Sequence, residues 1–184
     1  MAVFSNMLQL GTKAPDFNLF NPKEKKFQNL NELKSDIATV IMFICNHCPY
    51  VKHLNQAIVD LVTDYQKNGI SFIAINSNDA ENYPEDSPEK MVEYSEKLGY
   101  NFPYLYDEDQ TAAKNYLAAC TPDFYIFDNN MELIYRGQFD DSRPSNGIKP
   151  SGKDLRNALD SILRNEPVSS EQIPSIGCSI KWKK

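Results

Sequence analysis

The sequence lacks the features that mark several large classes of protein. Its 184 residues contain no apolar run of about 18, the length a transmembrane helix needs, so no membrane span is predicted. The formal net charge is -6, the pI is about 5.0 and no basic stripe occurs, which argues against nucleic acid or an anionic membrane as a partner. Residues 1–11 show no basic segment followed by an apolar run, so no signal peptide is predicted and we expect a cytoplasmic location.

Glycine and cysteine are also scarce. The seven glycines form no Gly-x-Gly-x-x-Gly motif, so no nucleotide or flavin cofactor is predicted. Four cysteines are too few for a disulfide scaffold, and a reducing cytosol does not maintain structural disulfides. A cysteine pair in such a chain is therefore expected to be catalytic or metal-binding.

The composition that remains is ordinary for a globular protein, with 41% hydrophobic and 24% charged residues. We expect residues 1–184 to form a single domain, because the length is typical of one. Its core is predicted over about residues 11–164, and residues 165–184 are predicted to form a C-terminal tail.

Two cysteines lie where a buried strand is predicted to turn into a helix. Residues 38–44 form an apolar, β-branched run typical of a buried parallel strand, and Cys45 and Cys48 follow it directly. From Pro49 onward, apolar residues recur at three- and four-residue steps, which predicts a helix over residues 49–67 that ends near Gly69. A helix N-terminus stabilises a thiolate, the reactive form of cysteine. The C-x-x-C spacing in this context predicts redox chemistry.

The rest of the chain predicts an α/β protein. Residues 70–75 form a second buried strand, which gives a parallel strand–helix–strand unit. Ser87 and Pro88 begin a helix that ends at Gly99. The other predictions are a weak strand over residues 14–19, a polar loop over 76–86, a helix over 110–119, a hairpin of strands over 120–127 and 131–137, and a final helix from residue 151 to about 164 that begins with a capping box.

This order of elements resembles the thioredoxin fold, which has a central mixed sheet flanked by helices. The opening Ala14-Pro15-Asp16-Phe17 resembles the N-terminal extension of the redoxin branch of that superfamily. More narrowly, the chain resembles a peroxiredoxin-like family of AhpC/TSA type whose members keep the thioredoxin C-x-x-C. The segments that carry this resemblance are residues 45–53 (CNHCPYVKH), 75–79 (INSND), 120–124 (CTPDF), 136–144 (RGQFDDSRP) and 176–182 (IGCSIKW).

The resemblance implies roles for five residues. It implies that Cys45 is an exposed nucleophile of lowered pKa that attacks a substrate disulfide, and that Cys48 resolves the mixed disulfide. It also implies that Thr121 and Pro122 shape the substrate site, with a cis peptide bond between them. His47 stands where thioredoxins carry proline, and a nearby imidazolium would stabilise the thiolate and raise the reduction potential.

The resemblance also implies the partners of a thiol–disulfide oxidoreductase. The expected substrate is a protein or small-molecule disulfide, and the expected electron donor is a thiol system such as thioredoxin or glutathione. The seven residues before Cys45 contain no carboxylate, so the sequence leaves the proton acceptor for Cys48 open.

Two other functions stay open. One is a thiol peroxidase in which Cys48 is peroxidatic and Cys45 or Cys178 resolves, although the peroxiredoxin pattern Pro-x-x-x-Thr/Ser-x-x-Cys is absent. The other is a redox-sensing or metal-holding module, for which Cys45, Cys48 and His53 have a plausible ligand spacing. The chain has only two histidines and no distant one, so no metal is expected.

The remaining two cysteines are possible accessory thiols. Cys120 lies two residues before Pro122, where it either joins the active site or packs as a small apolar residue. Cys178 lies in the predicted tail, where it either resolves a disulfide or packs beside Trp182 and anchors the tail.

Overall fold

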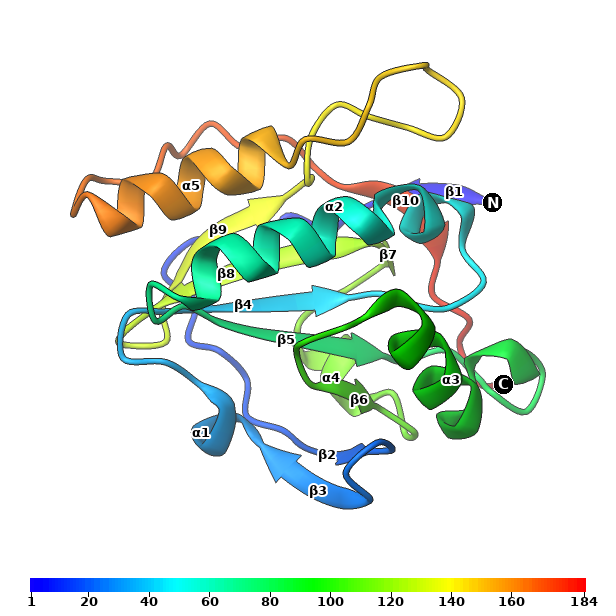
Figure 1. The fold of residues 1–184 in the computed structure, drawn as a ribbon. Helices are drawn as coiled ribbons and strands as arrows, with labels where there is room; N and C mark the ends of the chain where they lie inside the picture. The colour runs from blue at the N-terminus through cyan, green and yellow to red at the C-terminus, as the bar shows by residue number, and fades with distance from the viewer.

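The computed structural model describes residues 1–184, and Figure 1 shows its elements in chain order. The strands are β1 (Ala2–Phe4), β2 (Asn18–Asn21), β3 (Lys26–Asn29), β4 (Ala38–Phe43), β5 (Ser71–Asn76), β6 (Tyr104–Tyr106), β7 (Cys120–Thr121), β8 (Asp123–Asp128), β9 (Leu133–Gly137) and β10 (Ile176–Ser179). The helices are α1 (Leu30–Leu33), α2 (Pro49–Gln66), α3 (Pro88–Leu98), α4 (Thr111–Asn115) and α5 (Lys153–Leu163), with a short 3-10 helix, η1 (Pro84–Asp86).

Seven strands form one mixed sheet in the order β3-β2-β6-β5-β4-β8-β9. Strand β4 runs parallel to β5 and antiparallel to β8, and β8 and β9 form an antiparallel hairpin. Helices α2 and α5 cover one face of this sheet, whereas α4 lies on the other (Figure 1). These observations confirm the predicted α/β class, the parallel strand–helix–strand unit and the hairpin.

The central strand β4 is apolar throughout because both of its faces are buried. Val40 and Met42 belong to the core beneath α2, whereas Ile41 and Phe43 belong to the core beneath α4. A strand covered on both sides shows no alternation of apolar and polar residues, which is the pattern the sequence has here. The strand therefore leads from the protein core to the start of α2.

None of the helices combines the length and apolar character needed to cross a membrane.

A second, three-stranded sheet joins the two ends of the chain. Its order is β1-β10-β7, with β10 antiparallel to both neighbours. The predicted C-terminal tail contains a strand over residues 176–179, and this strand, β10, fills the edge beside β7. Figure 1 shows β1 and β10 side by side near the N-terminus.

Two predicted boundaries are also wrong. Strand β2 begins at Asn18 rather than at residue 14, and before it the backbone makes only an isolated bridge from Lys13 to Glu132. Helix α4 ends at Asn115 rather than at residue 119, because Leu117 has a left-handed backbone with φ of 53°.

The predicted capping box at the start of α5 does not form. The N-cap residue is Gly152, with φ of 70° and no side-chain cap. The buried carboxylate of Asp140 instead accepts the N–H groups of Ser151 and Gly152, each at 2.6 Å. Asp140, eleven residues before Ser151, thus accepts the backbone N–H groups at the start of α5 in place of the predicted capping box.

Candidate active site

The C-x-x-C pair lies on the turn that joins β4 to α2. The N–H of Ile44 donates to the carbonyl of Ile75, which extends the parallel pairing of β4 and β5 past the end of β4. Cys48 is the N-cap residue of α2 and Pro49 occupies its first turn, where the missing N–H costs nothing. The predicted position of both cysteines at the strand-to-helix turn is therefore correct.

The predicted exposure of Cys45 is wrong. Cys45 is 1% exposed and Cys48 0% exposed, and both are free thiols. Thr121 covers them from β7: its Oγ1 lies 3.2 Å from Cys45 Sγ, and its carbonyl accepts from Cys48 Sγ–H at 3.2 Å. The Thr121–Pro122 peptide bond is cis. One residue of the predicted substrate site thus contacts both sulfurs directly.

The pKa values of the two adjacent thiols shift in opposite directions. The hydrogen bond from Cys45 lowers the pKa of Cys48 to about 5; burial opposes this, while further hydrogen bonds from Cys178 and from the backbone of Val51 reinforce it. The pKa of Cys45 is raised well above its ordinary value because Cys45 donates to Cys48, because it is buried and because Asp86 lies near. These directions differ from the expectation that Cys45 has the lowered pKa. When Cys48 is protonated, its S–H donates instead to the Thr121 carbonyl.

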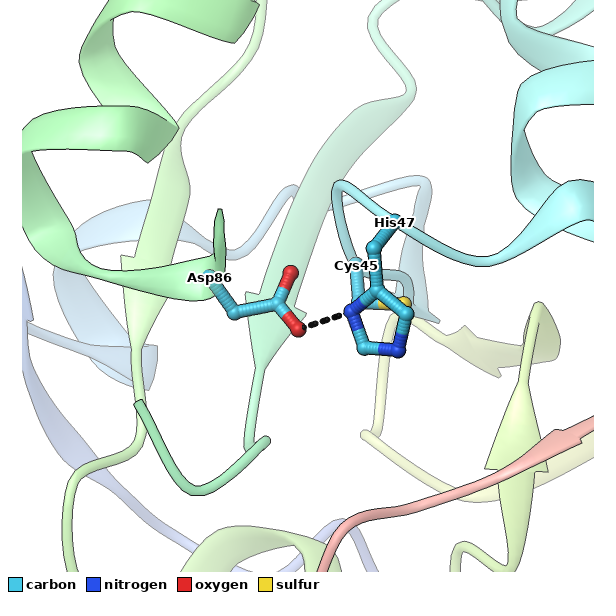
Figure 2. Close-up of side chains that lie close together, drawn as sticks. All are labelled: Cys45, His47 and Asp86. Atoms are coloured by element: carbon cyan, nitrogen blue, oxygen red, sulfur yellow. Dashed lines mark hydrogen bonds and ion pairs between the residues drawn. The ribbon is translucent and has the colours of Figure 1, made fainter. Parts of the chain in front are cut away.

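Asp86 is the site residue that the sequence did not indicate. It lies in η1, within the predicted polar loop, and its side chain is 0% exposed. Its Oδ1 accepts the backbone N–H of Asn46 at 2.7 Å, and its Oδ2 lies 2.6 Å from His47 Nδ1 and accepts from Asn78 Nδ2 at 2.8 Å. Figure 2 shows this carboxylate facing His47, with Cys45 beside the imidazole ring. Asp86 therefore fixes the loop between the two cysteines.

The electrostatics of this pair follow from its burial. The hydrogen bond to Asp86 raises the pKa of His47, although partial burial of the imidazole opposes the shift. Burial alone would raise the pKa of Asp86, but the hydrogen bonds from His47, Asn78 and the backbone of Asn46 outweigh it and lower that pKa. The imidazole also stacks on the ring of Tyr83, with centroids 5.6 Å apart and an interplanar angle of 9°. The carboxylate of Asp86 thus favours the protonated form of His47, whose charge it neutralises.

The two accessory cysteines have different surroundings. Cys120 is fully buried, its Sγ lies 3.7 Å from the carbonyl of Pro122, and burial raises its pKa. Cys178 lies on β10, is half-buried and packs against the core that contains Cys48. The structure thus brings Cys178 to the C-x-x-C pair and leaves Cys120 bonded elsewhere.

The ligand set considered for a metal also changes. Cys45 Sγ, His47 Nδ1 and a carboxylate oxygen of Asp86 lie within 4.8 Å of one another, and His53 is outside this group. Thiolate, imidazole and carboxylate are all zinc ligands. However, His47 Nδ1 and Asp86 Oδ2 already bond each other, so a cation would have to break that pair to bind both.

The fold and the buried cysteine pair define a thioredoxin-like protein of the redoxin type. The sequence matches the AhpC/TSA family over residues 10–136, and the chain belongs to that family. A search of the curated proteins finds no match.

Similar solved structures agree with this assignment. A conserved protein from Geobacillus kaustophilus is 61% identical, with a TM-score of 0.98 over 100% of this chain and 97% of that one. A protein from Sinorhizobium meliloti 1021 is 44% identical, with a TM-score of 0.95 over 98% of both chains. The thioredoxin domain of a thiol-disulfide oxidoreductase from Bacteroides vulgatus shares the fold at 12% identity, with a TM-score of 0.60 over 70% of this chain and 88% of that domain.

Proposed function

We propose that this chain is a thiol–disulfide oxidoreductase whose redox centre is the pair Cys45 and Cys48. The observation that carries the proposal is a pair of free cysteines at the start of α2 whose two sulfurs both contact Thr121, beside the cis Thr121–Pro122 bond. Adjacent thiols of opposite pKa shift can exchange with a disulfide in two successive steps. Membership of the AhpC/TSA family supports the same class of chemistry.

The proposed reaction transfers two electrons from the pair to a substrate disulfide. The Cys48 thiolate attacks one substrate sulfur, and the other substrate sulfur leaves as a thiolate. Cys45 then loses its proton and attacks Cys48, which closes the Cys45–Cys48 disulfide and releases the second substrate thiol. This order is the reverse of the one the sequence implied, because the pKa of Cys48 is lowered and that of Cys45 is raised.

The dithiol is restored by a thiol donor, such as a thioredoxin or glutathione system. Stabilising the thiolate favours the reduced pair and raises its reduction potential. We therefore expect a couple more oxidising than thioredoxin, whose potential is about −270 mV. Thr121 contacts both sulfurs, and we propose that it and Pro122 bind the substrate disulfide.

The test is the reduction potential of the pair in glutathione buffers, measured by mass spectrometry after the free thiols are alkylated. The expected result is a reversible Cys45–Cys48 disulfide with a potential above about −270 mV. Cys120→Ala is the matched control and should keep this potential, whereas Cys45→Ser and Cys48→Ser should lose the disulfide. Failure to form the disulfide at any potential would contradict the function.

One observation favours a second candidate, a thiol peroxidase. A buried thiolate of low pKa suits a small oxidant such as a hydroperoxide, and Cys48 is such a thiolate. Attack by Cys48 breaks the O–O bond and leaves a sulfenic acid on Cys48 and an alcohol, or water when the substrate is hydrogen peroxide; the thiol of Cys45 then condenses with the sulfenic acid, forms the disulfide and releases water. Rapid peroxide consumption that Cys48→Ser abolishes and Cys45→Ser does not would favour this candidate.

A further inference from the structure

Strand β10 places a third thiol at the redox centre. In the pairing of β10 with β7, Cys178 lies directly opposite Thr121, the residue whose carbonyl accepts from Cys48 Sγ. Cys178 packs against the hydrophobic core that contains Cys45 and Cys48. The C-terminal segment therefore brings a cysteine to the sulfur of Cys48 from a position 130 residues later in the chain.

The close approach of β10 depends on a glycine next to Cys178. A Cβ atom placed on Gly177 would lie 2.0 Å from the carbonyl oxygen of Thr121, far inside van der Waals contact. Strand β1 pairs with the other edge of β10 and places Ala2 opposite Cys178, so both edges of this short strand are bonded. Cys178 is thus held beside Cys48 by pairing on both sides rather than by a loose C-terminal tail.

Exposure separates Cys178 from the C-x-x-C pair. Both sulfurs of the pair are buried, whereas Cys178 is half-buried. A soluble thiol can therefore reach Cys178 more readily than Cys45 or Cys48. The hydrogen bond between Cys178 and Cys48 contributes to the lowered pKa of Cys48, while burial and the nearby Cys48 raise the pKa of Cys178 to about 11. These shifts agree with the register that places Cys178 opposite Thr121, the residue that contacts Cys48.

We propose that Cys178 is a third redox-active thiol, which exchanges with the Cys45–Cys48 disulfide to form a Cys48–Cys178 disulfide. The Cys178 thiolate attacks the sulfur of Cys48, the bond between Cys48 and Cys45 breaks, and Cys45 leaves as a thiolate. Cys45 then takes up one proton, in place of the proton that Cys178 lost. The exchange breaks one S–S bond and makes one, so it consumes no oxidant or reductant.

The exchange rests on the proposed function, because it starts from the Cys45–Cys48 disulfide. Its consequence is that the disulfide moves from a buried pair to a half-buried cysteine. An external thiol, such as glutathione, then attacks the sulfur of Cys178, and Cys48 leaves as a thiolate. A second thiol attacks the resulting Cys178 mixed disulfide and releases Cys178 as a thiol, so the protein is reduced without a direct attack on the buried sulfurs. Cys178 is thereby the entry point for the electron donor.

Cleavage by trypsin places the cysteines on three different peptides. Cleavage after Lys34 and Lys52 leaves Cys45 and Cys48 together on residues 35–52. Cleavage after Arg164 and Lys181 leaves Cys178 alone on residues 165–181, and Cys120 falls on residues 115–136. An internal disulfide therefore keeps residues 35–52 as one unlinked peptide, whereas the exchanged disulfide links that peptide to residues 165–181.

The experiment equilibrates the full-length protein in glutathione buffers, quenches it with acid, blocks free thiols with N-ethylmaleimide and identifies the tryptic peptides by mass spectrometry. Wild-type protein should give both the internal disulfide and the peptide linked to residues 165–181. Cys45→Ser should give the linked peptide alone, and Cys48→Ser should lose it. Cys178→Ser should keep only the internal disulfide, and the control Cys120→Ala should match the wild type.

The outcomes separate the two proposals. Absence of the linked peptide from both the wild type and Cys45→Ser, while Cys178→Ser still forms the internal disulfide, would overturn the exchange alone. Absence of the internal disulfide from Cys178→Ser would overturn the proposed function and the exchange with it. Unchanged reduction of the oxidised protein by glutathione in Cys178→Ser would overturn the role of Cys178 as the entry point for electrons.

Discussion

Asp86 shows how much of this site depends on one buried carboxylate. It bonds the backbone of Asn46, the imidazole of His47 and the amide of Asn78. These partners come from the C-x-x-C loop and from the loop after β5, so Asp86 joins two segments at the edge of the sheet. Each of these groups would lose a hydrogen bond inside the protein if the carboxylate were removed, which is costly for buried polar groups.

We predict that Asp86→Asn lowers the pKa of His47 and destabilises the protein by about 3 kcal/mol, the cost of breaking a buried ion pair. The raised pKa of His47 contributes stability fully below the unfolded value of 6.5, and this is lost as the pH rises through the folded pKa. The lowered pKa of Asp86 contributes stability above the unfolded value of 3.8, and this is lost as the pH falls through the folded pKa. The loss in the variant should therefore be largest between pH 3.8 and 6.5.

Urea unfolding at a series of pH values measures this loss, and an NMR titration of the imidazole protons measures the pKa of His47. The chain has only two histidines, so His53→Gln assigns the signals and serves as the control. A loss of stability that does not vary between pH 3 and 8 would show that the ion pair is not its cause.

We also predict that the thiolate of Cys48 depends on the hydrogen bond from Cys45. Cys45→Ser keeps a donor at this position, so the pKa of Cys48 should stay near 5, whereas Cys45→Ala removes the donor and should raise it. Thiolate absorbance near 240 nm, followed against pH in the reduced protein, measures both values. Cys48→Ser should lose the step at low pH and Cys120→Ala should keep it; equal titrations of the two Cys45 variants would refute the hydrogen-bond explanation.

Some residues of the site could be predicted from the sequence around them, and others could not. Cys45, His47 and Cys48 could be predicted because their spacing and the flanking strand and helix patterns lie within one short segment. Asp86 could not, since it lies in a polar loop and acquires its role only when η1 packs against the turn before α2. The burial of Cys45 could not be predicted either, because it results from Thr121 on a distant strand.

The helices and strands that could be predicted from the sequence are those with a strong periodic or apolar pattern. Strands β4 and β5 and helix α2 each bury enough apolar side chains to determine their own structure. Strands β1 and β10 have three and four residues, and each is stable only through pairing with the opposite end of the chain. A sequence pattern cannot indicate pairing between the two ends of the chain. The sequence therefore predicts a tail around Cys178, whereas the structure has this residue on β10.

We predict that Gly177→Ala displaces β10 from β7. The added Cβ would lie 2.0 Å from the Thr121 carbonyl oxygen, and this backbone atom cannot move aside as a flexible side chain could. The expected cost is about 1–3 kcal/mol, as for overpacking in a core. Urea unfolding measures the cost, and hydrogen exchange at the amides of β1 and β10 locates it.

Ser179→Ala is the matched control, since it changes a residue of the same strand without adding atoms near Thr121. It should leave both the stability and the hydrogen exchange close to the wild type. Gly177→Ala should also lose the peptide that links Cys48 to Cys178. Equal protection of β10 in Gly177→Ala and the wild type would show that the close approach to Thr121 is not required.

The redox centre combines a thiol of lowered pKa, Cys48, with a thiol of raised pKa, Cys45. These two pKa values determine how the reduction potential of the protein responds to pH. Above the pKa of Cys48, near 5, the reduced pair holds one proton, on Cys45; below it, the pair holds two. The disulfide holds none. The number of protons taken up with the two electrons therefore changes from two to one as the pH rises through that value.

We predict that the reduction potential falls by about 60 mV per pH unit below pH 5 and by about 30 mV per unit from pH 5 to near 9, because a tenfold change in a two-electron equilibrium is about 30 mV. Potentials measured against glutathione and dithiothreitol buffers from pH 4 to 9 test this. Cys178→Ser and Cys120→Ala are the controls, because both variants keep the Cys45–Cys48 pair. Cys45→Ala cannot serve here, since it cannot form the disulfide. A constant slope of about 60 mV up to pH 8 would mean that both thiols are protonated in the reduced protein, and the attacking thiolate would then have to form only when a substrate binds.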